Sequence, residues 1–596
     1  MLPDAVRHPH CAALNVTRSF SGRKWMFRES DRQAVRLLEQ VAGVSPTLAQ
    51  LLSVRQVAAD CVADYLNPTL KRFLPEPLTL KDMNIAVARA ESAVKSGETI
   101  TVFGDYDVDG SCSAALLHDF LTALGLSPVL YVPDRLKEGY GPNAAALLRL
   151  KESGASLVIT VDCGAAAHAA LEAARNAHLD IIVLDHHAVD HEVPAVAHIN
   201  PNRRGDESGL GYLCAAGVTF LFAVALNRCL RNSGWYVQNG IAEPDLRACV
   251  DLVGLATICD VVPLVGVNRA FVRSAQSKLS ALERPGIRAL AAVAAVEPPF
   301  TAYHCGFVFG PRINAGGRVG RSSLGAELLT ERNDSEALIL AQQLDRHNRE
   351  RQAIEALIVQ EAIGLAANQS DRPYTLVSGD GWHPGVVGIV AGRLKERYRK
   401  PAIVIGFEGG LGRGSARSVP GIDIGSVIRR ACEAGILESG GGHAMAAGLS
   451  LASDRFDAFG EHLAVSLASA NDKADCQTEL TLDALVSTSG ATPALAEEIE
   501  RAGPFGAGNS EPVLAACGVR LAYADIVGQG HMRLRLEGGD GSRLSAIAFR
   551  AAGTALGEAL QRARGGHVHA AGFLRVNRWN GRTEAQLQVE DAAAAA

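Results

Sequence analysis

The chain has no pair of cysteines spaced as C-x-x-C, although twelve cysteines occur between Cys11 and Cys517. Zinc ribbons and disulfide frameworks need clustered cysteines, so neither is expected, and a reducing cytoplasm fits. Long apolar runs are missing too, because no uncharged run approaches the roughly 20 residues of a membrane span. Met1 is not followed by a basic stretch and an apolar core. We therefore expect a soluble cytoplasmic protein with no membrane partner.

The sequence also lacks a surplus of positive charge. Its formal net charge is -6, and only 20% of its residues are charged. The net charge therefore gives no argument for nucleic-acid binding. It does not exclude such binding, because the carboxylates of a metal site would offset a basic surface elsewhere in the net charge. Hydrophobic residues make up 48% of the 596 residues. This length predicts roughly three to four domains, each with its own core.

The most informative stretch is Gly104-Asp-Tyr-Asp-Val-Asp-Gly110. It follows an apolar, β-branched run at residues 99–103, which is typical of a buried parallel strand, and it precedes a helical pattern at residues 113–124. Alternate residues of an extended segment point to the same side, so its three aspartates would repel one another unless a cation neutralised them. The stretch predicts a divalent metal site at the carboxyl edge of a sheet.

The same acidic pattern D-x-D-x-D-G also opens a calcium-binding helix-loop-helix loop, which needs a bidentate Glu at its twelfth position. That position is Leu116, and the preceding element is predicted to be a strand, so we reject the calcium loop. A solvated acidic turn stays open on this stretch alone.

Strands and helices alternate at short spacing after the acidic stretch. Strands are expected at residues 128–132, 157–161 and 180–184, and helices at 143–152 and 165–177. This alternation predicts an α/β fold with a doubly wound parallel sheet.

Further acidic and histidine residues follow the same strand ends. Asp162 follows the strand at 157–161, Asp185-His186-His187 follows the strand at 180–184, and an apolar run at 252–258 ends at Asp260. Singly, Asp162 could cap a helix and His186 could be a core histidine. Together, four segments deliver carboxylates and imidazoles near one sheet edge, which favours a two-metal site. This ligand mixture suits manganese, with magnesium as a plausible substitute.

The segments G-D-Y-D-x-D-G, V-D-x-G, D-H-H and C-D-V-V-P-L occur in this order. They resemble the four motifs of the DHH phosphoesterase superfamily, specifically its RecJ branch of single-strand-specific exonucleases. Further segments that resemble those of the RecJ branch begin at Glu138, Gly310, Trp382, Gly440 and Gly503. The resemblance covers nearly the whole chain from about residue 70. The chain departs from the family's motifs at Cys112, Cys259 and Ser510. None of these departures removes an expected ligand.

The resemblance implies that five residues hold two metal ions and that three others act in catalysis. The metal ligands would be Asp107, Asp109, Asp162, His186 and Asp260. The catalytic residues would be Asp105, Asp185 and His187. Asp162 would bridge the two ions, His187 would face the scissile phosphate, and Asp185 would orient the histidine pair.

Residues farther along the chain are candidates for phosphate binding. We expect residues 310–320 to form a turn-rich basic loop whose Arg312, Asn314 and Arg318 bind phosphate, although an ordinary connecting loop is equally consistent. In a second α/β domain, Ser415, Arg417 and His443 could hold a phosphate or the terminal nucleotide. His443 is chosen only on the resemblance, because a lone histidine after three glycines is more often structural.

Short alternating strands with glycine-rich turns begin near residue 480 and predict a small β-barrel, which the resemblance identifies as an OB fold. Arginines and aromatic residues are interleaved from His531 to Arg582, a composition that suits single-stranded nucleic acid. The alternative is a solvated basic surface with aromatics such as Phe549 in the core. The DNA-binding candidates are Arg533, Arg535, Arg578 and Trp579. Residues 592–596 are expected to be disordered.

The expected domains combine these predictions with the resemblance. They are a flexible arm (1–28), a helical preface (29–98), a DHH catalytic domain (99–325), a connecting helix (326–369), a DHH-associated α/β domain (370–470) and an OB-fold DNA-binding domain (475–592). The connecting helix should begin at the capping sequence Asn333-x-x-Glu336.

The resemblance implies a metal-dependent exonuclease that hydrolyses single-stranded DNA from the 5′ end to mononucleotides in DNA repair and recombination. Single-strand-binding protein or a helicase would be its candidate protein partners. Two further functions stay open: a phosphoesterase of short oligonucleotides or cyclic dinucleotides, and a non-catalytic single-stranded-DNA-binding scaffold. The long chain and the added barrel disfavour the first, and the complete ligand set disfavours the second.

Overall fold

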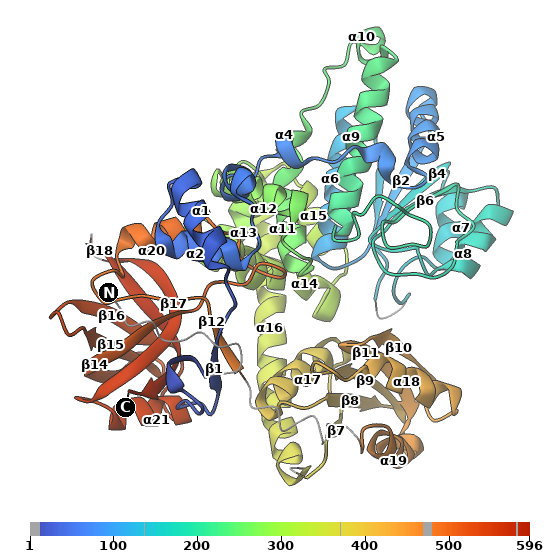
Figure 1. Cartoon of the computed structure of the whole chain (residues 1–596). Helices are drawn as coiled ribbons and strands as arrows, with labels where there is room; N and C mark the ends of the chain where they lie inside the picture. Colours follow the sequence, from blue (N-terminus) through green and yellow to red (C-terminus); the bar gives the residue numbers. More distant parts are fainter. Residues whose placement is uncertain (1–11, 136–137, 370, 469–478, 580–581, 596) are drawn as a thin grey trace. The chain divides into compact units, whose positions relative to one another are not determined.

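The structure is a computed structural model that describes residues 12–135, 138–369, 371–468, 479–579 and 582–595 (Figure 1). The chain divides into two compact units. The first unit consists of residues 1–75, 261–274 and 477–596, and the second of residues 76–260 and 275–476. None of the described helices is long and apolar enough to cross a membrane.

The second unit contains a five-stranded sheet in which every neighbouring pair of strands is parallel. The strands are, in spatial order, β3 (Val129–Tyr131), β2 (Ile100–Gly104), β4 (Leu157–Val161), β5 (Asp180–Leu184) and β6 (Ala197–Ile199). Every residue of β2 and β4 is buried, as expected for inner strands with helices on both faces. The order reverses between β2 and β4, so the topological switch point, where open α/β sheets bind ligands, lies there.

Helices cover both faces of this sheet, which confirms the predicted doubly wound fold (Figure 1). One face packs against α7 (Ala144–Glu152) and α8 (His168–Asn176), whose apolar side chains share a core with β4 and β5. The helices on the other face are α5 (Met83–Ser96), α6 (Val108–Ala123) and α9 (Ala215–Asn232).

The acidic stretch does not stay extended, contrary to the prediction. Helix α6 begins at Val108, so Asp107 is its N-cap residue and Asp109 lies in its first turn. Gly110 makes this early start possible, because a Cβ atom there would lie 2.5 Å from the backbone oxygen of Asp105. The three aspartates are therefore spread over a strand end and a helix N-terminus.

Two segments that looked irregular or strand-like are helical. The apolar run at 252–258 lies in α11 (Val250–Cys259), and Asp260 is its C-cap residue. Residues 310–320, predicted to be a loop, form α14 (Gly310–Val319), which continues from a π-helical turn, η5 (His304–Phe309). The glycines there serve packing rather than turning, since a Cβ atom at Gly317 would lie 2.7 Å from the Tyr106 ring.

Further helices lie between α9 and the second α/β domain, and the last of them is the long connecting helix. They are α10 (Trp235–Asn239), α12 (Gly266–Ser280), α13 (Pro285–Ala294), α15 (Leu324–Thr330) and α16 (Asp334–Ala366). Residues 266–274 among them belong to the first unit. Asn333 caps α16 as predicted, because its side chain accepts hydrogen bonds from the backbone N–H groups of Ser335 and Glu336.

A second α/β domain follows α16 in the same unit, as predicted. Its sheet has the order β10 (Ser439–His443), β11 (Ala446–Ala452), β9 (Leu411–Arg417), β8 (Ala402–Glu408) and β7 (Thr375–Asp380). The pair β7–β8 is parallel, and the other three pairs of these described strands are antiparallel. The helices are α17 (Pro384–Tyr398), α18 (Ile424–Glu433) and α19 (Phe456–Ser466).

The first unit contains the predicted small barrel. Its strands are β14 (Leu514–Val527), β15 (His531–Glu537), β16 (Arg543–Ala548), β18 (Arg582–Ala594) and β17 (His567–Trp579), and a β14–β17 pairing closes the barrel. The other helices and strands of the first unit are shorter. They are α1 (Arg32–Ala42), α2 (Pro46–Val54), α3 (Val62–Leu66), α4 (Leu70–Phe73), β12 (Glu479–Leu482), β13 (Ala484–Leu485), α20 (Pro493–Glu500) and α21 (Ala555–Arg562).

The described residues near both ends of the chain are more ordered than predicted. Residues 1–11 of the expected arm lie outside the described residues, but β1 (Lys24–Phe27) pairs in parallel with β12. Trp25 is fully buried, and its Nε1–H donates to Asp591. At the other end, Ala592 and Ala593 are buried in β18. A four-residue strand and a run of alanines carry too little pattern to predict either packing from sequence.

Candidate metal centre and phosphate pocket

Four chain segments bring acidic and histidine side chains to the carboxyl edge of the parallel sheet. These segments follow β2, β4, β5 and α11. The residues are Asp105, Asp107, Asp109, Asp162, Asp185, His186, His187 and Asp260. The structure thus brings together all eight residues predicted to bind metal or to act in catalysis.

The ligand atoms of these residues are close enough to share cations. Nε2 of His186 lies 3.7 Å from Asp109 Oδ2, 3.4 Å from Asp162 Oδ1 and 3.5 Å from Asp260 Oδ2. Three groups have ligand atoms within 4.8 Å of one another: Asp105-Asp107-Asp162, Asp109-His186-Asp260 and Asp162-His186-His187. Because metal–ligand bonds are roughly 2.0–2.2 Å long, atoms that bind one ion lie a few ångströms apart.

Four buried atoms of this cluster have no hydrogen-bond partner among the described residues. They are Asp105 Oδ1, Asp162 Oδ1, His186 Nε2 and Asp260 Oδ2. Buried polar atoms are nearly always paired, because an unpaired one keeps its full cost of leaving water. Their convergence from four segments therefore fits a divalent metal site whose ligands are carboxylate oxygens and imidazole.

The protonation behaviour of the carboxyls supports the same assignment. Burial, followed by repulsion from Asp107 and Asp109, raises the pKa of Asp162 well above its usual range. Burial and the same two neighbours raise the pKa of Asp260 to about 8. A bound cation favours the ionised form of such groups, so we expect metal binding here to release protons.

The backbone holds two of these carboxylates in fixed positions. Asp162 has φ 61, in the left-handed region that aspartate tolerates better than most residues. Asp109 accepts hydrogen bonds from the backbone N–H groups of Ala215 (2.6 Å) and Ala216 (2.8 Å) at the start of α9. A helix N-terminus favours negative charge, so Asp109 is anchored although burial raises its pKa.

Asp185 and His187 form a coupled pair beside the metal ligands. Asp185 Oδ1 lies 2.7 Å from His187 Nδ1, and its carboxylate also accepts from the backbone N–H groups of Ala165 and His186. Burial disfavours charge on both groups, but their interaction outweighs it. The pKa of Asp185 is lowered, and that of His187 is raised to about 9.

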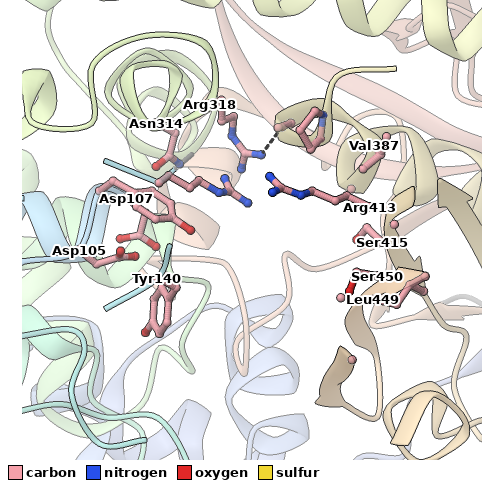
Figure 2. Close-up of a pocket in the computed structure, with 18 of the residues that line it drawn as sticks. Asp105, Asp107, Tyr140, Asn314, Arg318, Val387, Arg413, Ser415, Leu449 and Ser450 are labelled. Carbon is pink, nitrogen blue, oxygen red and sulfur yellow. Dashed lines mark hydrogen bonds between the residues drawn. The ribbon is translucent and has the colours of Figure 1, made fainter. Parts of the chain in front are cut away.

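The cluster opens into a cavity of about 850 Å³ within the second unit. Asp105, Asp107 and Tyr140 lie on one wall, and Ser415 and Ser450 lie on the other (Figure 2). Tyr140 donates its hydroxyl hydrogen to the backbone oxygen of Asp162.

Arginines gather in the same cavity. Its arginine lining residues are Arg135, Arg318, Arg413 and Arg417. Burial, followed by repulsion from Arg135 and Arg351, lowers the pKa of Arg318 to about 10. Clustered cations are stabilised by an anion in the same way that clustered carboxylates are stabilised by a metal ion. The cavity therefore suits a phosphate group that also touches metal.

The structure places most, but not all, of the predicted phosphate ligands in this cavity. Asn314, Arg318, Ser415 and Arg417 line it. Arg312 and His443 are not among the lining residues. Arg312 instead donates to Asp345 and to the backbone oxygen of Val308, and His443 is an exposed residue of β10.

Sequence reasoning missed Arg135, Tyr106 and Arg413 as lining residues. For Arg413 a signal was present, because Arg413, Ser415 and Arg417 alternate along β9 and so share one face of the strand. Arg135 and Tyr106 gave no comparable signal, since only the fold brings the Arg135 guanidinium to 4.9 Å from the Tyr106 ring centre.

On the barrel, Arg533 and Arg535 are exposed and alternate with buried residues of β15. The Arg533 guanidinium lies 5.4 Å from the Tyr523 ring centre. Arg578 is exposed and pairs with Glu497. Phe549 is 54% exposed, so it is not a core residue. Trp579 ends β17, but its side chain lies outside the described residues.

Three family profiles match the chain. They are the DHH family N-terminal domain at residues 99–255, the DHHA1 domain at residues 371–468 and the RecJ OB domain at residues 482–591.

Named relatives match over most of their length. The single-stranded-DNA-specific exonuclease RecJ of Dickeya dadantii is 36% identical over 85% of this chain and 89% of its own. That of Salmonella typhimurium is 35% identical over 95% and 98%. The crystal structure of Thermus thermophilus RecJ in complex with Mn²⁺ superposes with a TM-score of 0.77 at 28% identity, covering 95% of this chain and 78% of that one.

Proposed function

The chain belongs to the RecJ family of single-stranded-DNA-specific exonucleases, and from this we propose that it is a metal-dependent exonuclease that acts on single-stranded DNA. In full, we propose stepwise hydrolysis from the 5′ end to mononucleotides with two divalent ions, manganese in preference to magnesium. The observation that carries the proposal is the meeting of unpartnered buried ligand atoms and clustered arginines in one cavity of the described chain.

The residues proposed to hold the ions are those of the acidic cluster. They are Asp107, Asp109, Asp162, His186 and Asp260, with Asp105 beside them. When bound, divalent ions supply Lewis acidity toward the phosphate and stabilise the charge of the transition state.

The protein's own groups bind and orient the phosphate. Because Nδ1 of His187 is held by Asp185, Nε2 is the ring atom left to donate to the scissile phosphate. The raised pKa of His187 favours its protonated form, in which both ring nitrogens carry hydrogen. Arg318, Arg413 and Arg417 line the same cavity, where forked donors suit phosphate oxygens.

The barrel is proposed to bind DNA beyond the cleaved end. Exposed arginines beside aromatic rings, such as Arg533 over Tyr523, suit a backbone that needs cations and bases that need stacking faces. We further propose a cytoplasmic role in DNA repair and recombination, with single-strand-binding protein or a helicase as partner.

A time course on end-labelled DNA tests this function. A long single-stranded DNA labelled at its 5′ or 3′ end is incubated with manganese or magnesium, beside a duplex control. We expect immediate release of labelled mononucleotide from the 5′ end, an intact duplex and faster hydrolysis with manganese. Immediate release from the 3′ end alone would reverse the proposed polarity.

The same experiment separates the two alternatives. DNA that is bound but never cut with either metal would indicate a non-catalytic scaffold. Hydrolysis of a cyclic dinucleotide or a two-nucleotide DNA, with no release from the long strand, would indicate a phosphoesterase of small substrates.

A further inference from the structure

A second cavity, of about 750 Å³, is lined only by residues of the first unit. All three stretches of that unit contribute: residues 28–73, 264–269 and 483–510. The proposed nuclease function uses none of these lining residues. Its volume lies within the range of pockets that hold small organic ligands.

The charges that line this cavity do not balance. Four arginines and two aspartates contribute, namely Arg28, Arg55, Arg72, Arg269, Asp64 and Asp483. Two ion pairs, Arg28–Asp483 and Arg72–Asp64, neutralise both aspartates. Four positive and two negative charges leave a surplus of two positive charges, carried by Arg55 and Arg269. Within the described part of the chain, neither of these two arginines forms an ion pair.

Arg269 is the most deeply buried of the four arginines, with an exposed fraction of 5%. Its Nη2 donates to the backbone oxygens of Tyr65, Ala502 and Gly503. Its Nε and Nη1 atoms are buried and have no hydrogen-bond partner among the described residues. Burial, Arg55 and Arg273 all disfavour its charge and lower its pKa. An anion in the cavity would relieve this repulsion.

The rest of the lining is apolar. Its apolar side chains include Val54, Val57, Phe73 and Leu264, with the ring of Tyr65 beneath the Arg269 guanidinium. A phosphate monoester carries up to two negative charges near neutral pH, which match the surplus of two, and its oxygens suit the forked guanidinium donors. The apolar lining then needs a ligand with an apolar or aromatic body.

We propose that this cavity binds a small phosphate monoester with an aromatic body, of the nucleoside monophosphate class. The site is separate from the metal centre, and its occupancy does not depend on the nuclease reaction.

A cysteine that lines the cavity can report ligand binding. Cys61 lines it and is exposed, whereas the other described cysteines are buried or half-buried. A ligand in the cavity should therefore slow alkylation of Cys61. Because Asp60 raises the pKa of this thiol, labelling is best done slightly alkaline, at about pH 8.5.

The test measures N-ethylmaleimide labelling of the full chain by peptide mass spectrometry. EDTA is present to prevent metal-dependent hydrolysis. We expect saturating dAMP to slow labelling of Cys61 at least about fivefold, inorganic phosphate to slow it less, and deoxyadenosine not to slow it. Labelling of the half-buried Cys432 and Cys517 serves as the internal control and should not change.

Variants test whether the protection of Cys61 by dAMP depends on the arginines of this cavity. Arg28→Ala and Arg72→Ala lie at the more exposed rim, and each should raise the dAMP concentration for half protection about tenfold. The matched control, Arg247→Ala, removes an exposed paired arginine outside the cavity and should leave protection unchanged. Asp162→Asn, in the metal centre, should also leave it unchanged, which separates this site from the nuclease site.

Three outcomes would overturn the proposal. They are no protection by millimolar dAMP, equal protection by dAMP and deoxyadenosine, and protection that survives both rim variants. Protection by a 5′-phosphorylated oligonucleotide but not by free dAMP would assign the phosphate to a DNA end and would overturn the small-ligand assignment.

Discussion

We expect individual residues of the candidate metal centre to favour metal binding at the expense of stability in the metal-free protein. Asp105 and Asp162 are almost fully buried, and burial with neighbouring carboxylates raises the pKa of both. In the metal-free protein these carboxyls must either take up a proton or repel one another, whereas a divalent ion stabilises their ionised forms. Substitutions here should therefore act in opposite directions on metal-free stability and on function.

Asp162→Asn tests this trade. Asparagine tolerates the left-handed backbone at φ 61, so the fold should persist. We expect turnover to fall at least about 100-fold, as manganese affinity is lost, while the melting temperature in EDTA rises because a carboxyl no longer has to be buried beside other acidic groups. The measurements are the exonuclease rate and thermal unfolding with and without manganese. Retention of most metal-dependent activity would contradict the assignment of Asp162.

A second buried charge cluster in the same unit surrounds Arg284. Arg284 is buried and pairs with Asp119 (2.9 Å) and Asp251 (2.7 Å). Burial alone would raise the pKa of Asp119, but hydrogen bonds and attraction from His118 and Arg284 lower it overall. Removing Arg284 leaves Asp251 without this partner and Asp119 with Arg332 and His118.

Arg284→Met should destabilise the protein by about 3–5 kcal/mol at pH 7. The folded pKa of Asp119 lies below its unfolded value of about 3.9, so this stabilisation is present above that value and is lost as pH falls through the folded pKa. The difference from the unsubstituted protein should therefore shrink below about pH 4. Urea unfolding at several pH values measures it.

Arg231→Met is the matched control for Arg284. Its guanidinium pairs with Glu243 but is 54% exposed, so its loss should cost less than about 1 kcal/mol. An Arg284→Met loss no larger than that of this control, or one that does not change with pH, would contradict the role given to the cluster.

At the scale of elements, α14 positions part of the phosphate pocket. Asn314 and Arg318 lie one turn apart on it and both line the cavity. The helix packs closely on the acidic stretch because Gly317 has no side chain, and an added Cβ would lie 3.0 Å from Tyr106 Cβ. The helix can therefore move away from the metal centre only if this contact changes.

Gly317→Ala should displace Tyr106 or α14 and so misalign the phosphate pocket. We expect the exonuclease rate to fall about 10- to 100-fold, since misplacement by an ångström can cost this much, with smaller loss of stability. Gly364→Ala in α16 is the control, because an added Cβ there meets nothing within 4 Å. It should raise stability by up to about 1 kcal/mol and leave the rate unchanged. Equal rates in the two variants would contradict the packing argument.

At the scale of the whole molecule, the barrel does not stand alone in the chain. Arg269 donates to the backbone of Tyr65, Ala502 and Gly503 and so joins all three stretches of the first unit. Leu51 belongs to the core of the barrel cluster. Deleting the chain from about residue 475 would therefore expose the N-terminal segment as well. Point variants are the cleaner test of DNA binding.

The double variant Arg533→Ala/Arg535→Ala should weaken binding of single-stranded DNA. Both side chains are exposed on β15, so stability should change little. Each lost phosphate contact should lower the slope of log affinity against log salt by about 0.7 for a single strand. Fluorescence anisotropy at several salt concentrations measures this, and cleavage of a dinucleotide should be spared. The control, Arg562→Ala, removes an exposed arginine that pairs with Glu558 on α21. If the double variant weakens DNA binding no more than the control does, β15 is not part of the binding surface.

The sequence by itself determined the parallel sheet and which acidic and histidine residues meet at its edge. Both follow from local patterns, because buried strands read as short apolar runs and most of the candidate ligands come shortly after a strand, although Asp260 follows helix α11. Asp162 and the Asp185–His187 segment could thus be assigned before any contact was known. The capped helix α16 was also predictable, since a cap lies within a few residues of the helix it starts.

Only the tertiary structure decided which arginines face the phosphate pocket and where the chain's ends pack. Arg312 and Arg318 occupy similar local sequence, yet Arg312 is held by Asp345 while Arg318 lines the cavity. Arg413 enters the cavity from a strand more than 200 residues beyond Asp162. Likewise Trp25 is buried against β18 through Asp591 at the far end of the chain. Such contacts depend on how distant segments meet, which local composition and periodicity do not encode.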